Sequence, residues 1–320
     1  MDDARFRPGE LRLARIQVAA GKPTPISDLP ELEADAVAQL RAGGLRRVRV
    51  FDAPSWRFAA DCLAATARGG LAGPAGVVYA TEGGSGTGDA ARDVARSLEA
   101  AGLGGLPLFG AGLNLCANLG AVLTVSGSLV LAGFAASCLA VTVDGASAGE
   151  RLISGDMGIF SDAAASALVT RGPQDGPAFR ILGIEHATSA RLTLVSVIQQ
   201  DPLSASAFIK GVEAASDRLA EATGADPDDY AFVIANSYVS PAVEAMLTVL
   251  GIPMSRAYRG TAREYAHCFA ADGLVSLDRL ERTGLLADGD KVLLLSTSTS
   301  TWFLIALEYE AGNAAAARLQ

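Results

Sequence analysis

Three residues that lie far apart in the sequence, Cys116, Asn236 and His267, carry side chains that together suit acyl transfer from a thioester. A cysteine thiolate attacks a carbonyl carbon, an imidazole moves protons near neutral pH, and an amide NH2 group donates hydrogen bonds to an oxyanion. The chain has only one other histidine, His186, and its polar, turn-rich surroundings predict a surface position. His267 is therefore the sole candidate for the base.

The surroundings of Cys116 set it apart from the other three cysteines. It lies where a short apolar run, LPLFG, gives way to a long stretch of small and apolar residues, and this pattern predicts a strand followed by a helix that begins at Cys116. At a helix N-terminus the dipole and the free backbone amides favour a thiolate. The alternative is a small buried hydrophobe, which is how we interpret Cys62 and Cys138 in their apolar patterns and Cys268 beside His267.

Several segments resemble the thiolase superfamily, most closely its β-ketoacyl-acyl carrier protein synthase III branch. They are GLNLCANLGAVL around the nucleophile, FSDAAASALV, AFVIANSYVSPAVEAMLTVLGI, and the C-terminal LLADGDKVLLLSTSTSTWFLIALEYE. The resemblance extends from about Arg46 to Glu310. It implies a thiolase-like layered α/β fold of two pseudo-repeated halves. We place the half with the nucleophilic cysteine at residues 1–172 and the half with the asparagine and histidine at 173–320.

The sequence also departs from this family. Synthase III enzymes carry cysteine, then histidine, then asparagine, whereas this chain has Asn236 second and His267 third, an order similar to that of the degradative thiolases. The second catalytic cysteine of those thiolases is absent. A Ser/Thr run at 296–300 stands where both branches have a glycine-rich loop. The resemblance implies that His267 is the base, that Asn236 donates to an oxyanion, and that amides of Cys116 and the 296–300 loop hold the acyl intermediate. The swapped pair could instead mark a non-catalytic partner subunit.

Two arginine-rich segments are candidates for binding the donor. We select Arg46, Arg47, Arg259 and Arg263 as residues for the diphosphate of coenzyme A or the phosphopantetheine of an acyl carrier protein. Synthase III enzymes often have a tryptophan before the first of these turns, but here Trp56 lies beyond it. The donor therefore stays open between acyl-coenzyme A and an acyl carrier protein, and no permanently bound cofactor is expected. Either cluster could also be a solvated face.

Composition excludes several classes of protein. The 320 residues are 50% hydrophobic and 19% charged, with a formal net charge of −9, which argues for a well-packed globular chain and against nucleic acid and anionic membranes. The four cysteines form no CxxC motif or Cys/His cluster, so we expect no metal site and no disulfide framework. The N-terminus lacks an apolar signal core, and no apolar run approaches 18 residues, so we expect a cytoplasmic protein.

The order of apolar patterns predicts alternating strands and helices in both halves, which is typical of a layered α/β protein. We expect residues 1–45 to be irregular apart from a short helix, and 145–160 to be a loop. The cluster GPQDGP at 172–177 predicts the boundary between the halves. The apolar run AVTVDG needs a strand on each side, and with the resemblance it predicts a homodimer.

The glycines at 83–88 follow a predicted strand, which would suit a nucleotide-binding, dehydrogenase-like protein. However, they lack the GxGxxG spacing and are flanked by acids, which favours a flexible connector. The sequence therefore predicts a synthase III-type acyltransferase that forms an acyl-enzyme at Cys116. Its acceptor would be a malonyl-type carbanion, a hydroxyl or an amine, in fatty acid, polyketide or other secondary-metabolite biosynthesis.

Overall fold

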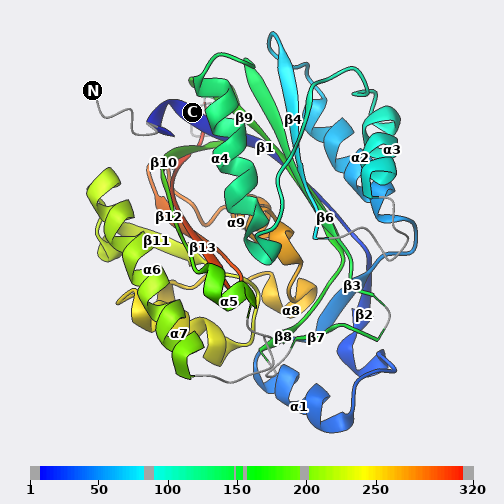
Figure 1. The fold of residues 1–320 in the computed structure, drawn as a ribbon, viewed down its shortest axis with the longest axis vertical. Coiled ribbons are helices and arrows are strands. Elements are labelled where there is room, and N and C mark those ends of the chain that lie inside the picture. Colours follow the sequence, from blue (N-terminus) through cyan, green and yellow to red (C-terminus); the bar gives the residue numbers. More distant parts are fainter. Residues whose placement is uncertain (1–7, 83–89, 148, 154–156, 195–201, 313–320) are drawn as a thin grey trace.

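The computed structural model describes residues 8–82, 90–147, 149–153, 157–194 and 202–312, and its centre is a mixed sheet (Figure 1). Nine strands form this sheet in the order β11-β12-β13-β10-β1-β9-β6-β4-β5. The predicted glycine loop at 83–88 lies outside the described residues. Strand bounds are β1 Leu11–Ala20, β4 Ala75–Ala80, β5 Leu108–Gly110, β6 Ser137–Asp144, β9 Ala163–Arg171, β10 Ala178–Thr188, β11 Tyr230–Ile234, β12 Lys291–Thr297 and β13 Thr301–Glu310.

The strand pairings repeat between the two halves of the chain. From β1 outward, β1 pairs antiparallel with β9, β9 antiparallel with β6, and β6 parallel with β4. From β10 outward, β10 pairs antiparallel with β13, β13 antiparallel with β12, and β12 parallel with β11. The two series meet where β1 pairs with β10. This repetition confirms the predicted α/β fold of two pseudo-repeated halves.

Helices cover and separate the two series of strands. They are α1 Ala34–Ala42, α2 Ser55–Ala67, α3 Ala90–Ala100, α4 Asn118–Leu131, α5 Ala190–Leu194, α6 Pro202–Thr223, α7 Ser240–Val249, α8 Ala262–Tyr265 and α9 Asp272–Arg282. One apolar cluster joins α4 and α9 to strands of both halves. A second joins α2 and α3 to β4, β6 and β9, and a third joins α6 and α7 to β11, β12 and β13. The result is a layered arrangement with α4 and α9 at the centre (Figure 1).

Two parts of the chain differ from the prediction. Residues 1–45 are not irregular, because β1 is a ten-residue strand that lies near the middle of the sheet. Its apolar alternation is interrupted between Ala14 and Gln17 by an irregular register, and Arg15 has a φ of 51°. The predicted loop at 145–160 contains a small hairpin of β7 (Leu152–Ile153) and β8 (Gly158–Ile159). A second small pair is formed by β2 (Lys22–Pro25) and β3 (Arg47–Val50).

The neighbours of β6 remove the physical reason given for a homodimer. This strand carries the AVTVDG run and is buried along its whole length. Both of its neighbours, β4 and β9, come from the same chain. The edge of this half of the sheet is β5 instead, so dimerisation stays a prediction that rests on other features.

Candidate active site

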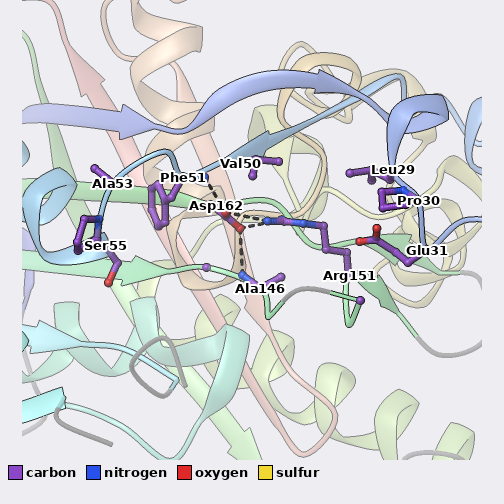
Figure 2. Close-up of a pocket in the computed structure, with 13 residues that line it drawn as sticks. Leu29, Pro30, Glu31, Val50, Phe51, Ala53, Ser55, Ala146, Arg151 and Asp162 are labelled. Carbon is purple, nitrogen blue, oxygen red and sulfur yellow. Dashed lines mark hydrogen bonds and ion pairs between the residues drawn. The ribbon is translucent and has the colours of Figure 1, made fainter. Parts of the chain in front are cut away.

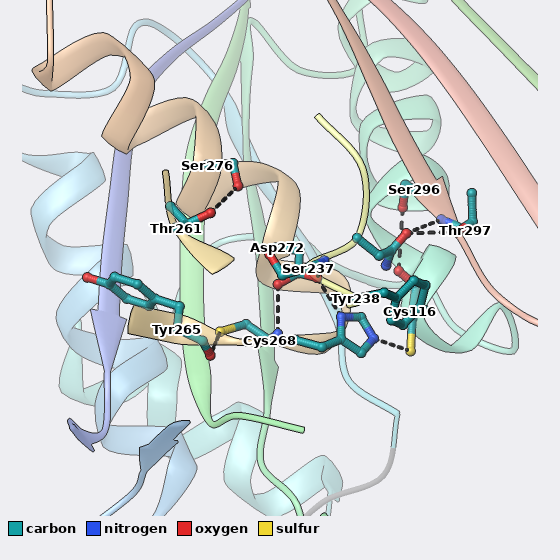
Figure 3. Close-up of polar contacts among 12 residues, drawn as sticks. Cys116, Ser237, Tyr238, Thr261, Tyr265, Cys268, Asp272, Ser276, Ser296 and Thr297 are labelled. Carbon is teal, nitrogen blue, oxygen red and sulfur yellow. Dashed lines mark hydrogen bonds and ion pairs between the residues drawn. The ribbon is translucent and has the colours of Figure 1, made fainter. Parts of the chain in front are cut away.

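The structure brings Cys116 and His267 into direct contact. Figure 3 labels Cys116 and Asp272, the two residues that bond to opposite sides of the His267 ring. The Nε2 atom of His267 lies 3.2 Å from the Cys116 Sγ atom. On the other side of the ring, Nδ1 lies 2.5 Å from Oδ2 of Asp272. The His267 side chain is completely buried and Asp272 is 4% exposed. Thiol, imidazole and carboxylate therefore form a continuous hydrogen-bonded chain, the arrangement in which a carboxylate orients a histidine that serves as base for a nucleophile.

Asp272 is held in place by its position at the start of α9. Its Oδ1 accepts a hydrogen bond from the amide of Cys268 at 2.7 Å, and its Oδ2 accepts one from the amide of Ser237 at 2.7 Å. An acid at a helix N-terminus is also favoured by the helix dipole. The carboxylate is thus fixed by two backbone N–H groups that come from different segments, and it links the strand-end after β11 to the His267 segment.

The His267 backbone is fixed as firmly as its ring. Its amide donates to the carbonyl of Ile159 at 3.1 Å, and its carbonyl accepts from the amide of Ser161 at 2.8 Å. The rings of Phe160 and Tyr238 lie 5.5 and 4.8 Å from the imidazole centroid. The hairpin that the sequence predicted as loop therefore supplies one wall of the site.

Cys116 does not begin the long helix. It lies in a 3-10 turn, Leu115–Ala117, immediately before α4. Desolvation by burial and the nearby carboxyl of Glu82 raise the pKa of the Cys116 thiol well above its usual range. This direction is opposite to the thiolate stabilisation predicted from a helix N-terminus. The thiol therefore rests protonated, and it needs His267 as a base to become a nucleophile.

Asn236 lies in the same region but not in contact with the thiol. Its Oδ1 accepts hydrogen bonds from the amide and the hydroxyl of Thr297, at 3.0 and 2.8 Å. The side chain is 2% exposed. With the carbonyl oxygen occupied, the NH2 group of Asn236 is the part left to act as a donor. The oxyanion role implied by the resemblance stays a prediction.

The 296–300 run lies against the nucleophile, since the Ser296 hydroxyl is 3.5 Å from the carbonyl oxygen of Cys116. Most amides of this run already have partners: that of Thr297 donates to Asn236, that of Ser298 to Thr301, and that of Ser300 to the Ser298 hydroxyl. Among the described residues no hydrogen-bond partner is found for the amide of Thr299. If an amide of this loop helps to hold an oxyanion, Thr299 is the candidate.

Sequence reasoning missed two acids, Asp272 and Glu82. For Asp272 the sequence offers one signal, an acid five residues after the candidate base. Glu82 follows β4, and its carboxyl group lies close enough to the Cys116 thiol to raise the pKa of that thiol. Burial raises the pKa of Glu82 from its usual range. It had been interpreted only as an acid that flanks the glycine loop.

The two predicted arginine segments lie side by side. The amide of Arg46 donates to the carbonyl of Arg263 at 3.2 Å. Arg47 pairs with Glu264 at 2.6 Å, and Arg263 lies 3.9 Å from the same carboxylate. Arg259 is half-buried and donates to the carbonyl of Tyr238 at 2.6 Å, so it lies close to the His267 ring. Arg46 and Arg263 are exposed.

A cavity of about 700 Å³ is lined in part by Ala146, Arg151 and Asp162, and the polar contacts among these residues serve the structure of the chain (Figure 2). Asp162 forms two bonds to Arg151, at 2.7 and 2.8 Å, and accepts the amides of Phe51 and Ala146. Both oxygens of the Asp162 carboxylate therefore have hydrogen-bond partners within the chain. Arg151 also donates to the carbonyl of Phe160, so this ion pair supports the wall beside His267. His186 is exposed, as predicted, but on β10 rather than in a turn.

Two negative findings complete the description. No helix among the described residues is both long and apolar enough to span a bilayer. In the same part of the chain, no group of three histidine, cysteine or acidic side chains is arranged to hold a metal ion.

Comparison with known proteins agrees with the fold and with the C-terminal half of the predicted resemblance. Residues 220–308 match the family 3-oxoacyl-[acyl-carrier-protein] synthase III C terminal. No curated protein matches the chain. Among solved structures, the chain is similar to ChlB3, an acyltransferase, with 17% identity over 95% of this chain and 98% of that one, and a TM-score of 0.79.

Two further structures show the same likeness. 3-Oxoacyl-(acyl carrier protein) synthase III of Pseudomonas aeruginosa PAO1 has 20% identity, with 94% of this chain and 98% of that chain covered and a TM-score of 0.76. An OleA variant of Xanthomonas campestris has 14% identity over 93% and 98%, with a TM-score of 0.75. The chain therefore has the thiolase-type fold of these proteins, and the predicted resemblance to the synthase III branch is confirmed.

Proposed function

We propose that this protein is an acyltransferase that takes an acyl group from a thioester onto Cys116 and passes it to a hydroxyl or amine acceptor. The observation that carries the proposal is the hydrogen-bonded chain from the Cys116 thiol through His267 to Asp272. The fold supports it, because similar structures include an acyltransferase and a 3-oxoacyl synthase III.

The first half-reaction follows from the protonated resting thiol. As Cys116 Sγ attacks the thioester carbonyl, His267 Nε2 takes the thiol proton, and Asp272 stabilises the resulting imidazolium. The amide of Cys116 and, in the loop at 296–300, the amide of Thr299 would donate to the oxyanion of the tetrahedral intermediate. The intermediate then collapses, His267 returns the proton to the departing thiol of the donor, and an acyl-enzyme remains.

The second half-reaction distinguishes two classes of acceptor. A hydroxyl or amine has a proton that must be removed as it attacks, and the His267–Asp272 pair provides a base for this step. A malonyl-type acceptor instead forms its carbanion by losing carbon dioxide, which requires donors to the enolate oxygen but no base. An imidazole backed by a carboxylate is suited to proton removal, so the relay favours transfer to oxygen or nitrogen over carbon–carbon condensation.

The donor would be an acyl-coenzyme A or an acyl carrier protein. Arg46 and Arg263 are exposed residues whose backbones share a hydrogen bond, so they belong to one face, and Arg259 donates to the carbonyl of Tyr238, whose ring packs beside His267. Such a face suits the phosphate groups of coenzyme A or phosphopantetheine. In an acidic chain it is also a local attraction for an acidic carrier. We further propose a cytoplasmic location and a role in fatty acid, polyketide or related biosynthesis.

A panel of acyl thioesters, followed by intact-mass analysis, tests the proposal. The expected result for the wild type is a mass increase of one acyl group that neutral hydroxylamine removes, because the adduct is a thioester. Cys116→Ser should carry no adduct that neutral hydroxylamine removes. Absence of any adduct across donors bound to coenzyme A, pantetheine and carrier protein would favour the rival role, a non-catalytic partner subunit of a ketosynthase-like complex.

A further inference from the structure

The unexplained feature of the site is a second acidic group at the thiol, on the side that the His267 relay does not use. Glu82 follows β4, and its carboxyl group lies close enough to the Cys116 thiol that each group shifts the pKa of the other. Its amide donates to Oδ1 of Asp144 at 2.6 Å, and the Thr81 hydroxyl donates to the same oxygen at 2.9 Å. Asp144 ends β6, which runs parallel to β4. Glu82 is therefore anchored by its backbone at the carboxyl ends of two adjacent parallel strands.

One oxygen of this carboxyl group has nothing to bind within the described part of the chain. Oε1 of Glu82 is buried and forms no hydrogen bond there. A buried polar atom without a partner costs free energy, and a substrate group that donates to it removes this cost. The unpartnered oxygen belongs to a carboxyl group that acts electrostatically on the nucleophile, so a substrate group at the acyl-transfer centre is a suitable donor to it.

The surroundings of the thiol also carry an excess of acidic groups. Glu82, Asp144 and Asp272 all act on the thiol electrostatically and raise its pKa. Burial raises the pKa of Glu82 and that of Asp144, so this region disfavours carboxylate charge, and a malonyl-type acceptor would bring a further carboxylate into it. An acceptor without negative charge avoids this cost.

We propose that Glu82 makes the site selective for an amine acceptor, whose nitrogen places one N–H on the free Glu82 oxygen and the other on Nε2 of His267. This inference rests on the proposed function and identifies the acceptor class of the same site. A hydroxyl has one O–H and satisfies one of the two groups. A malonyl thioester satisfies neither and adds a charge. Glu82 is thus a residue that determines specificity.

The chemical step balances without any further reactant. The amine nitrogen bonds to the carbonyl carbon of acyl-Cys116, and His267 takes one N–H proton as this bond forms. The carbon–sulfur bond then breaks, and the proton passes from His267 to the departing Cys116 sulfur. The products are an amide and the free thiol. Glu82 holds the second N–H throughout and keeps no proton at the end.

The test measures deacylation alone, so that it is independent of how fast Cys116 is loaded. The wild type and Glu82→Gln are loaded with a butyryl thioester of N-acetylcysteamine and separated from free thioester. Each acyl-enzyme is mixed with glycinamide or with glycolamide, a pair that differs only in amine against hydroxyl. Rates are referred to the concentration of unprotonated amine. Glu213→Gln, which removes a charge from an exposed position on α6, is the matched control.

We expect Glu82→Gln to lower the ratio of the glycinamide to the glycolamide rate constant by about tenfold or more, the scale of a lost hydrogen bond to a charged group. The control should keep the wild-type ratio within about twofold. An unchanged ratio in a loaded, folded Glu82→Gln acyl-enzyme would overturn the inference, as would faster wild-type deacylation by malonyl-pantetheine than by glycinamide. If neither the wild type nor any variant is acylated by the thioester, the proposed function itself is wrong.

The dependence on pH provides a second readout. Within the described ranges, the titratable groups that interact electrostatically with Glu82 are Cys116, which is acylated here, and His267, Asp144 and Tyr238. His267 serves both acceptors equally. The wild-type ratio should therefore rise with pH as Glu82 ionises, while the ratio for Glu82→Gln stays flat. A parallel rise in both proteins would assign the effect to another group. If Glu82→Gln does not fold, Glu82→Asp, which keeps the charge but withdraws the carboxyl group, should lower the ratio in the same direction.

Discussion

At the scale of single residues, the central feature is a thiol that is not activated at rest. Burial and the carboxyl of Glu82 raise its pKa, so nucleophilicity depends on His267 and on the acid behind it. This differs from cysteine sites in which a helix N-terminus or a cation stabilises the thiolate. It predicts how turnover responds to substitution of the base and how alkylation of the thiol depends on pH.

The base can be tested by substitution. His267→Ala should lower turnover by about 10²-fold or more, the usual scale of general-base catalysis, and Asp272→Asn should lower it in the same direction because the imidazole loses its orienting partner. His186→Ala is the matched control, since His186 lies exposed on β10 and stacks on Phe303. Steady-state rates with one thioester measure all three. A damaging His186→Ala with a silent His267→Ala would reverse the assignment.

Alkylation tests the state of the thiol. At neutral pH, iodoacetamide should modify Cys116 before the other three cysteines, because Cys62, Cys138 and Cys268 are buried. The rate at Cys116 should nevertheless be low and should rise with pH beyond the range of an ordinary thiol, since its pKa is raised. In Glu82→Gln one cause of that increase is removed, so the profile should move to lower pH. Peptide mass analysis gives the site-resolved rates, and equal labelling of all four cysteines would contradict this account.

At the scale of elements, the position of the nucleophile depends on how closely α4 approaches β13. A Cβ atom added at Gly120 would lie 2.1 Å from the ring of Phe303. Gly120→Ala should therefore destabilise the protein by about 1–3 kcal/mol through overpacking, although the same change in an open helix would stabilise it. Chemical denaturation measures the difference. Gly105→Ala, where no atom lies within 4 Å, is the control, and equal stability of the two variants would show that α4 adjusts freely.

The elements that the sequence predicted well are those with continuous apolar patterns. β4 and β6 are buried on both faces, so their runs of apolar residues were unmistakable. β1 was missed because Arg12 and Arg15 break its pattern, and β10 because its second half carries polar residues. Burial of β1 depends on β9 and β10, which are remote in sequence, and no local pattern contains that information.

The residues of the site were likewise predicted only in part, because some of them have a role that depends on contacts remote in sequence. Cys116 and His267 were found because their side chains are scarce and chemically distinctive. Asp272 and Glu82 belong to a common residue type, and only their burial beside the thiol and the imidazole gives them a role. The fold alone brings the end of β4 near enough to the turn before α4 for Glu82 and Cys116 to shift the pKa of each other. Pairs of residues of this kind can be identified only from the structure.

At the scale of the whole molecule, the sheet leaves one edge that suits a second copy of the chain. β5 is the terminal strand, and the large apolar side chains of Leu108, Leu113 and Leu115 are 46%, 100% and 42% exposed. An edge strand beside exposed leucines favours association. Analytical ultracentrifugation at micromolar concentration should therefore show a mass near twice the 32.7 kDa of one chain. A single species at 32.7 kDa would contradict the predicted homodimer.

The central claim is that the thiol, the imidazole and the carboxylate act together to accept an acyl group, and loading of Cys116 tests it most directly. A pre-steady-state time course of intact mass with a butyryl thioester compares the wild type with His267→Ala and Cys116→Ala. The account predicts rapid addition of one butyryl group to the wild type, loading slowed by about 10²-fold in His267→Ala, and none at this site in Cys116→Ala. An adduct that forms equally fast in all three proteins would place the acylated group elsewhere and contradict the account.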